Sequence, residues 1–162
     1  MDHTQYNIIS IGNVGSKKGN YSISIYKAFR QGLTALDGFT HIQVLWWSHL
    51  IDDEENRKRV IYPKPYTKGP DRVGVFATRS PVRPNPVSLT AAQVISIDME
   101  SGIIELAYMD AEHGTPVIDI KPYHPSTERI KHAATPEWCS HWPQWYEDSG
   151  SFDWGSEMSF EE

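Results

Sequence analysis

Short segments in which apolar and polar residues alternate run through most of this chain, and they constrain its fold more than any other feature. In YSISIY, residues 21–26, Tyr21, Ile23 and Ile25 alternate with Ser22 and Ser24. This period of two is typical of a β-strand with one buried face. Tight-turn positions are expected for Gly12, Gly15 and Gly19. The pattern predicts strands over residues 7–14, 21–26, 41–48, 72–78, 89–97, 103–109 and 116–120.

Helical patterns are short in this chain. Residues 27–36 fit two turns, and residues 52–60 place acids before bases, the order that a helix dipole favours. Residues 127–134 fit a third helix, capped by Ser126 or Thr127. Because short strands follow one another without regular strand–helix alternation, the pattern predicts an all-β fold, a mostly antiparallel β-barrel or sandwich with short helices. No GxGxxG motif follows the first strand, which argues against a Rossmann-like sheet.

Length and composition indicate one soluble globular domain. The chain has 162 residues, of which 39% are hydrophobic and 22% charged. No apolar run approaches the roughly 20 residues of a membrane span, so no membrane partner is expected, and the first residues lack the pattern of a secretion signal. Cys139 is the single cysteine, which excludes an intrachain disulfide and fits a cytoplasmic location. Cys139 and His141 lack a second ligand pair, so no metal site is predicted.

The acidic balance of the chain belongs to its C-terminal part. The net charge is −6, yet no Lys or Arg follows Lys131, whereas seven acidic residues do, so residues 1–131 carry 15 basic against 14 acidic side chains. We therefore expect a domain over residues 1–147 and an acidic tail over 148–162, which is either flexible or docked through its aromatic residues. Those aromatic residues are Phe152, Trp154 and Phe160.

A proline-rich block, GVFATRSPVRPNPVSL at residues 74–89, interrupts the strand pattern. Its three prolines fall within six residues, and each fixes its own φ and keeps the residue before it extended. The block is therefore predicted to be a stiff segment, and Arg79 and Arg83 would offer planar donors to a carboxylate or phosphate. A rigid surface connection with solvated arginines is the alternative interpretation.

Three blocks together resemble the TsaA-like (TrmO) family. They are LDGFTHIQVLWW at residues 36–47, the proline-rich block, and DAEHGTPVIDIKPY at residues 110–123. The resemblance implies a small antiparallel single-sheet β-barrel, usually a homodimer, that uses S-adenosyl-L-methionine as its methyl donor. It also implies an acceptor: N6 of threonylcarbamoyladenosine beside the anticodon of tRNA.

The resemblance implies cofactor contacts from three places. They are the proline-rich block, the turn that precedes PVID, and the segment that follows the strand ending in WWS. Carried over to this sequence, the cofactor-binding residues are His49, Leu50, Arg79, Leu89, His113, Gly114, Thr115 and Pro116.

Three departures from the family pattern keep other functions open. His113 stands where the family turn usually has Asp, the family's Pro-Arg-Gln cofactor segment has no counterpart in SKKGNYSISIY at residues 16–26, and no RNA-holding C-terminal extension is seen. One alternative is a methyltransferase that acts on a small molecule. The other is a non-catalytic module that binds a cofactor or a partner.

Two segments are candidates for chemistry and for RNA binding. Asp119, Lys121 and Tyr123 are the predicted catalytic residues, with Asp119 as a base or an orienting group and Lys121 as a phosphate ligand. If Val117, Asp119 and Lys121 share a strand face, Asp119 and Lys121 are neighbours. A structural Asp–Lys pair is the alternative. Residues 57–72 hold six basic side chains with two tyrosines between them, which fits RNA binding as well as it fits a solvated loop.

Overall fold

The computed structural model describes residues 4–159, which cluster into two compact units. Residues up to Asp52 and Asn85–Arg129 form the first, which we call the barrel unit. Asp53–Pro84 and the residues from Ile130 onward form the second unit. Each unit is therefore built from two separate stretches of the chain, and each is described below by itself. No helix within residues 4–159 is long and apolar enough to cross a membrane.

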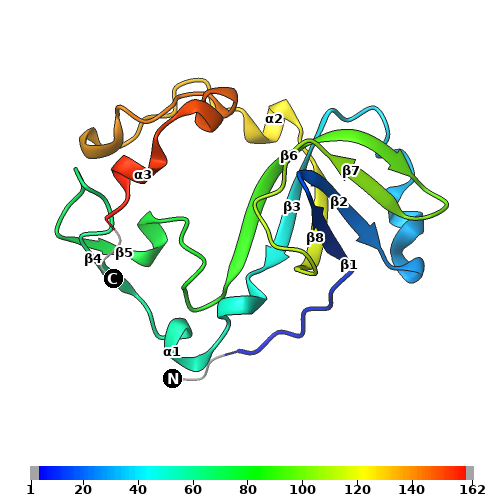
Figure 1. Cartoon of the computed structure of the whole chain (residues 1–162), viewed down its shortest axis with the longest axis horizontal. Helices are drawn as coiled ribbons and strands as arrows, with labels where there is room; N and C mark the ends of the chain where they lie inside the picture. The colour runs from blue at the N-terminus through cyan, green and yellow to red at the C-terminus, as the bar shows by residue number, and fades with distance from the viewer. Residues whose placement is uncertain (1–3, 160–162) are drawn as a thin grey trace. The chain divides into compact units, whose positions relative to one another are not determined.

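The barrel unit is a closed antiparallel sheet (Figure 1). Neighbouring strands follow the order β1-β2-β7-β6-β3-β8, and β8 pairs with β1 to close the ring. The predicted all-β barrel is therefore confirmed. The strands are β1 (Gly12–Lys17), β2 (Asn20–Ile25), β3 (His41–Trp47), β6 (Val87–Asp98), β7 (Ile103–Leu106) and β8 (Pro116–Pro122).

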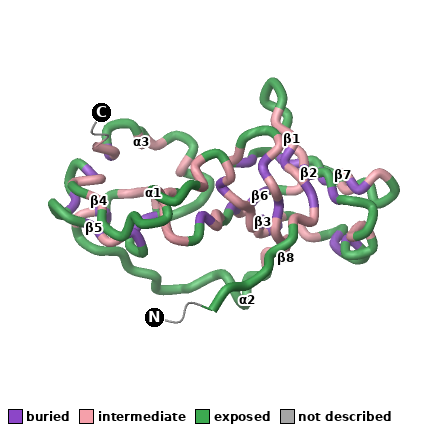
Figure 2. Tube along the Cα trace, turned by 90° about the horizontal axis from the view of Figure 1, so that it is seen from below, coloured by how far each residue is buried: buried purple, intermediate pink, exposed green. Residues whose placement is uncertain are grey.

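Alternation along these strands fills the interior of the barrel with branched apolar side chains. Buried positions recur at every second residue of β1, β2 and β3, as Figure 2 shows by colour. A 3₁₀ helix at Lys27–Leu33 adds Leu33 to the same core. Further members of the core are Val14, Ile23, Ile25, Ile42, Val44, Ala92, Ile104, Leu106 and Val117.

The first strand begins later than the alternation predicts. Residues 7–14 read as a strand, but β1 starts at Gly12, and Ile8 and Ile9 are 53% and 64% exposed. Backbone pairing explains the difference: β8 begins at Pro116, opposite Asn13, and Ile11 makes the last bond to it through the Val117 carbonyl. Without a neighbouring strand the residues before Ile11 have no ladder to join.

The predicted helices are shorter than their sequence patterns. Residues 27–36 contain the 3₁₀ helix, and residues 52–60 contain only α1 (Glu54–Arg57), whose cap is Asp53. The third helix, α2 (Pro125–Glu128), was predicted over residues 127–134. It starts two residues earlier and ends at Glu128, six residues before the predicted end. Its cap is the His124 side chain, which accepts a hydrogen bond from the Ser126 amide, so the prediction of a Ser126 or Thr127 cap was wrong.

The hairpin between β1 and β2 places a lysine in the left-handed region of the backbone. Lys17 pairs with Asn20, leaving a two-residue loop in which Lys18 has φ 53° and Gly19 has φ 81°. Positive φ at both loop residues is the signature of a type I′ turn, for which Asn-Gly is the preferred pair. Lys18 is therefore a poor residue for this turn, because its Cβ crowds the following carbonyl.

Replacing Lys18 by asparagine should make the barrel unit more stable. Asparagine tolerates the left-handed region better than lysine does, and the gain should be up to about 1 kcal/mol in the free energy of unfolding. Urea titration of the two proteins measures it. A variant that is less stable than the wild type would show that the Lys18 side chain stabilises the fold.

The second unit is held together mainly by aromatic contacts. It contains α1, a small sheet of β4 (Ile61–Pro63) and β5 (Arg72–Gly74), α3 (Trp154–Glu157) and 3₁₀ helices at Val75–Ala77, Glu137–Cys139 and Tyr146–Ser151. Tyr66 stacks on Trp138 at 5.2 Å, and Trp142 meets both rings edge-on. Trp138 and Trp142 thus pack within the second unit.

The last described residues belong to this aromatic cluster. Phe152 lies against Trp154 at 4.9 Å, and Trp154 lies against Trp142 at 5.3 Å. Two of the expected docking residues are therefore packed within the second unit, whereas Phe160 lies outside the described residues. The domain boundary at residues 147 and 148 stays a prediction.

A buried carboxylate joins three parts of the second unit. Glu157 accepts hydrogen bonds from His141 Nε2 at 2.8 Å and from Trp142 Nε1 at 3.2 Å. Lys68 Nζ lies 3.6 Å from the same side chain. These contacts, chiefly the hydrogen bond from His141, hold the pKa of Glu157 below its ordinary value of 4.5.

Mild acid should therefore loosen the second unit. A carboxyl group whose pKa is lower in the folded state stabilises the fold above pH 4.5, and that stabilisation is lost as the pH falls through the folded pKa. The urea midpoint read from tryptophan fluorescence should fall between pH 5.5 and pH 3, and Glu157→Gln should flatten this dependence. Equal slopes for the two proteins would remove Glu157 as the cause.

Candidate functional site

The proline-rich block uses its two arginines differently. Arg83 is half-buried and its Nη1 donates to the carbonyls of Thr78 and Ser80, at 3.5 and 3.4 Å. Tyr62 adds hydrogen bonds of 2.7 Å with the Ser80 hydroxyl and the Val82 carbonyl. The arginine at 83 thus braces the segment itself, whereas the side chain of Arg79 is exposed. Arg79 belongs to the second unit.

The end of β3 is tied to the start of β6 inside the barrel unit. The Ser48 amide donates to the Pro86 carbonyl at 2.8 Å, and the hydroxyls of Ser48 and Ser88 are 2.8 Å apart. His49 and Leu50 follow in a 3₁₀ helix, His49–Ile51. Leu50 is 69% exposed, so this end of the barrel presents an apolar side chain to solvent.

The turn at residues 112–115 lies against β1. The Thr115 amide donates to the Glu112 carbonyl at 3.2 Å, and Gly114 takes φ 84°, a conformation that favours glycine. Gly114 donates to the Val14 carbonyl, and Val14 donates to the Thr115 carbonyl. Gly114 is therefore favoured by its positive φ, Thr115 is fixed by backbone hydrogen bonds to Glu112 and Val14, and Pro116 is the first residue of β8.

Strand register brings these predicted cofactor residues to one end of the barrel. Trp46, near the end of β3, pairs with Val117 at the start of β8 and with Ser88 at the start of β6. The 3₁₀ helix after β3, the first residues of β6 and the turn before β8 therefore meet at the same end. The residues gathered there are His49, Leu50, Leu89, His113, Gly114, Thr115 and Pro116.

Asp119 and Lys121 form an ion pair, the arrangement that the sequence analysis gave as the alternative to catalytic roles, with Lys121 Nζ 2.6 Å from Asp119 Oδ2. Asp119 Oδ1 accepts from the Ile120 amide at 2.9 Å, so both carboxylate oxygens are engaged. The hydrogen bond from the lysine and the charge of the carboxylate raise the pKa of Lys121. The pair thus fits a role for Asp119 in positioning the Lys121 ammonium group.

Asp119 does not share a strand face with Val117, so the condition under which the sequence made Asp119 and Lys121 neighbours is not met. The register between β3 and β8 shifts between Leu45, opposite Asp119, and Trp46, opposite Val117, which leaves Ile118 as an extra residue. Val117 is buried and Ile120 packs against the core, whereas the Asp119 side chain is 44% exposed. A β-bulge of this kind shifts the alternation by one position.

Tyr123 lies at the other end of the barrel. Its amide donates to the carbonyl of His41, the first residue of β3, and its ring meets the His41 ring at 6.3 Å. The six residue steps from His41 to Trp47 span about 20 Å at 3.3 Å per step. Within one chain the structure therefore brings Asp119, but not Tyr123, toward the predicted cofactor residues. Asp119 is the nearer because it lies opposite Leu45, which also pairs with Leu89.

The basic segment 57–72 does not offer both of the predicted stacking residues. Tyr66 is buried against Trp138, and the Tyr62 hydroxyl donates a hydrogen bond to the Val82 carbonyl inside the second unit. Three of the basic side chains are near acids: Lys58 lies 2.9 Å from Glu54, Lys64 lies 3.5 Å from Asp71, and Lys68 lies close to Glu157. The interpretation of Tyr66 as a base-stacking residue was therefore wrong, whereas that of Tyr62, whose ring is half-buried, stays a prediction.

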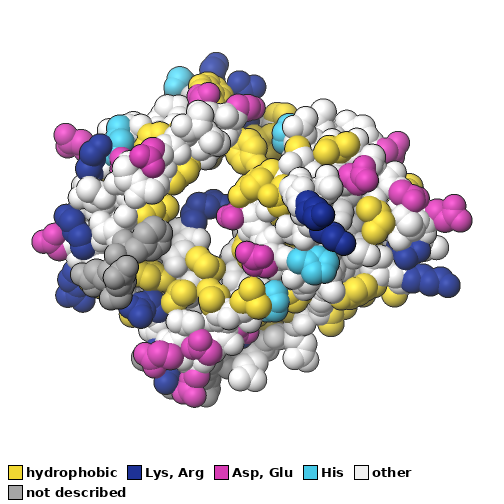
Figure 3. Space-filling model, viewed as in Figure 1, with side chains coloured by type: hydrophobic (Ala, Val, Ile, Leu, Met, Phe, Trp, Pro, Cys, Tyr) yellow, Lys and Arg dark blue, Asp and Glu magenta, His cyan; other side chains and the backbone are white. Residues whose placement is uncertain are grey.

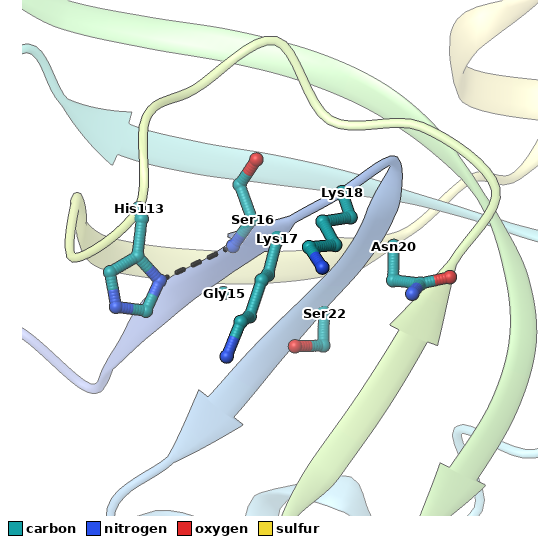
Figure 4. Close-up of a pocket in the computed structure, with 7 residues that line it drawn as sticks. All are labelled: Gly15, Ser16, Lys17, Lys18, Asn20, Ser22 and His113. Carbon is teal, nitrogen blue, oxygen red and sulfur yellow. Dashed lines mark hydrogen bonds between the residues drawn. The ribbon is translucent and has the colours of Figure 1, made fainter.

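A pocket of about 530 Å³ on the barrel unit escaped the sequence analysis (Figure 4). The β1–β2 hairpin supplies most of it, and the turn before β8 supplies His113. The signal available in the sequence was the pair of lysines in the segment that replaces the family's Pro-Arg-Gln. The lining residues are Gly15, Ser16, Lys17, Lys18, Asn20, Ser22 and His113.

Comparison with known proteins relates the chain to methyl-donor-binding proteins. It is 36% identical over 101 residues to a probable S-adenosyl-L-methionine-binding protein of Halobacterium salinarum, covering 62% of this chain and 73% of that protein. It is also 33% identical over 142 residues to a probable S-adenosyl-L-methionine-binding protein of Pyrococcus horikoshii, covering 81% of this chain and 99% of that protein.

Two further comparisons concern longer proteins. The tRNA (adenine(37)-N6)-methyltransferase of Escherichia coli is 33% identical over 122 residues, with 73% of this chain and 51% of that enzyme covered. The crystal structure of TrmO from Pseudomonas aeruginosa superposes with a TM-score of 0.63 at 22% identity, covering 81% of this chain and 61% of that one. The latter shows a shared fold, and the chain spans about half to two thirds of the length of these two proteins.

The family model for the tRNA-methyltransferase O N-terminal domain matches residues 5–129. That range includes the whole barrel and every predicted site residue, and it confirms the resemblance drawn from the sequence. Because the match covers well over half of the residues of this chain, the chain belongs to the tRNA-methyltransferase O N-terminal domain family.

Proposed function

We propose that this protein is an S-adenosyl-L-methionine-dependent methyltransferase that methylates N6 of threonylcarbamoyladenosine in tRNA. The observation that carries the proposal is the family match over residues 5–129. The gathering of the predicted cofactor residues of the barrel unit at one barrel end supports it. The tRNA acceptor follows from the described activity of the Escherichia coli relative.

The residues at the barrel end suit this cofactor. Leu50 and Leu89 are 69% and 42% exposed, which leaves apolar side chains available to a nucleoside. The turn at His113–Pro116 offers backbone groups close to β1. Arg79 is not among these barrel residues but is an exposed residue of the second unit, and the resemblance assigns its guanidinium group to the cofactor, where it would suit the carboxylate. When bound, the cofactor supplies an electrophilic methyl group carried by a sulfonium.

The protein's own contribution would be alignment and control of a proton. A nucleophile must be held about 3 Å from the methyl carbon, and an adenine N6 must lose its proton during transfer. We assign Asp119 and Lys121 to positioning the acceptor. Their ion pair is already formed, and Asp119 lies opposite Leu45, which also pairs with Leu89 of the predicted cofactor site. Lys121 would then hold a phosphate of the acceptor. Tyr123 lies at the opposite end of β3, so within one chain it is out of hydrogen-bond reach of an acceptor held beside these residues.

A small-molecule acceptor is the second candidate, and the net charge of −6 favours it, since RNA is a polyanion. Methyl transfer from radiolabelled S-adenosyl-L-methionine to bulk tRNA, compared with a pool of small metabolites, separates the two. We expect label in tRNA, recovered in a modified adenosine after digestion. Label in metabolites alone would remove the tRNA assignment, and binding of the cofactor without any transfer would favour a non-catalytic module.

We also propose a cytoplasmic homodimer, the usual arrangement in the family that the sequence resembles. Ile95, on the outward-facing part of β6, is 65% exposed and is one apolar side chain that a second copy could cover. Light scattering after size-exclusion chromatography measures the mass directly. A single species near 18.5 kDa would contradict the dimer.

A further inference from the structure

The pocket on the β1–β2 hairpin is lined by cationic and hydrogen-bonding groups. Figure 4 shows Lys17 extending over the hairpin between His113 and Ser22, with Lys18 at the tip. Over the same hairpin, Figure 3 shows two basic side chains next to each other with a histidine beside them. No Asp or Glu is among the described residues that line the pocket. It is therefore positively charged.

Neither lysine is neutralised by its surroundings. Among the residues that the structure describes, Lys17 and Lys18 have no carboxylate within ion-pair distance. The nearest acid by strand register is Glu105, which lies opposite Ser22 on β7 and accepts a hydrogen bond from Ser96 at 2.8 Å. Two unpaired ammonium groups on one hairpin are a favourable position for an anion.

The floor of the pocket is shaped to leave polar groups accessible. Gly15 has no side chain, and a Cβ there would lie 2.4 Å from Ser22 Oγ, so any larger residue would cover the hydroxyl. His113 Nδ1 accepts a hydrogen bond from the Ser16 amide at 3.4 Å, which leaves Nε2 of the neutral ring as a donor. The histidine that departs from the family's usual Asp thus replaces an acceptor-only carboxylate by a donor next to two lysines.

The conformation of Lys18 suggests that its side chain has a use other than stability. Its φ of 53° belongs to a position where asparagine or glycine would fit the turn better. Strained backbone of this kind is commonly kept at binding sites. Lysine at this position projects a cation beyond the hairpin that neither preferred residue would provide.

We infer that this pocket binds a phosphate group in the backbone of the RNA acceptor, an inference that rests on the proposed function. None of the described residues that line the pocket is Phe, Tyr, Trp or Arg, so the pocket lacks a large aromatic ring for base stacking and a guanidinium fork for a bidentate contact. Lysines, a hydroxyl and an imidazole on an open surface suit a phosphodiester, whose recognition depends on charge and position. The site would thus fix where the RNA lies and would not read its sequence.

The salt dependence of tRNA binding tests the inference. Fluorescence anisotropy with labelled bulk tRNA, between about 50 and 200 mM salt, gives the slope of log affinity against log salt concentration. Removing a lysine that contacts a phosphate should reduce the slope by about 1. The variants are Lys17→Gln and Lys18→Asn, the second of which gives the turn its preferred residue, so that loss of binding cannot come from unfolding. Lys27→Gln, an exposed lysine of the same unit, is the matched control.

The outcomes separate this inference from the function on which it rests. Smaller slopes for both hairpin variants, with an unchanged slope for Lys27→Gln, would support the phosphate site. Wild-type slopes in both hairpin variants would overturn the phosphate site and leave the tRNA methyltransferase intact. If the wild type binds S-adenosyl-L-methionine in calorimetry but binds no tRNA, the acceptor assignment fails, and the phosphate site fails with it.

Discussion

Arg79→Ala should weaken the binding of S-adenosyl-L-methionine at least tenfold. Loss of a charge-assisted hydrogen bond to the cofactor carboxylate costs on the order of 1.5–3 kcal/mol, and about 1.4 kcal/mol corresponds to a factor of ten. The neighbouring prolines and the bonds of Arg83 fix the segment, so the loss should come from the contact and not from disorder of the block. Calorimetric titration of the cofactor into both proteins measures it.

Two further variants make the result specific to the guanidinium group. Arg79→Lys keeps the charge without the planar fork, so its affinity should lie between those of the wild type and the alanine variant. Arg72→Ala removes an exposed arginine of the same unit and should leave affinity unchanged. Equal affinities for the wild type and Arg79→Ala would exclude Arg79 from the cofactor site, and equal losses in Arg72→Ala would point to a general charge effect.

Gly12→Ala should destabilise the barrel by about 3 kcal/mol or more, the upper range for inserting atoms into a tightly packed site. A Cβ at this position would lie 2.3 Å from the Ser24 carbonyl oxygen and 3.1 Å from the Ile25 Cα. Both atoms are backbone, so no side-chain movement can make room. Gly12 also pairs with Ile25 on one side and with Val117 on the other, at the seam where the sheet closes.

Urea unfolding of Gly12→Ala should be compared with that of Gly32→Ala. Gly32 lies in the 3₁₀ helix of the same unit, and a Cβ there would meet no atom within 4 Å. The control should therefore stay within about 0.5 kcal/mol of the wild type, as is usual for a surface change. A wild-type midpoint for Gly12→Ala would mean that β1 and β2 can separate at this point without losing the barrel.

The alternation of residues predicted the barrel strands well, because a closed sheet with one buried face imposes a period of two. Its failures have local causes. Gly12 and Gly15 were assigned to turns, yet both lie inside β1, where the close approach of β2 excludes a side chain. The bulge at Ile118 also has no sequence signal of its own, since it depends on how β8 meets β3. Such features belong to strand pairing and not to composition.

The turn of the candidate site follows from the family resemblance, whereas the role of Arg83 and the hairpin pocket depend on the folded structure. The resemblance implied a turn at HGTP, residues 113–116, and the structure has a turn there, in which Gly114 takes a positive φ that was not predicted. The engagement of Arg83 with its own segment could not be read from the sequence, because nothing in residue order tells which of two arginines turns inward. The hairpin pocket was missed for a similar reason: Ser22 and His113 become neighbours of Lys17 only through the fold.

The seam between β1 and β8 has a consequence for the speed of folding. Gly12 pairs with Val117, so the sheet cannot close before nearly all of the barrel sequence has been brought together. Contacts between residues so distant in sequence slow folding, and all-β domains of this kind typically need milliseconds to seconds. Until the seam forms, β1 and β8 each present an unpaired edge to other chains. The yield of refolding should therefore fall as protein concentration rises, because the association of open sheets competes with ring closure.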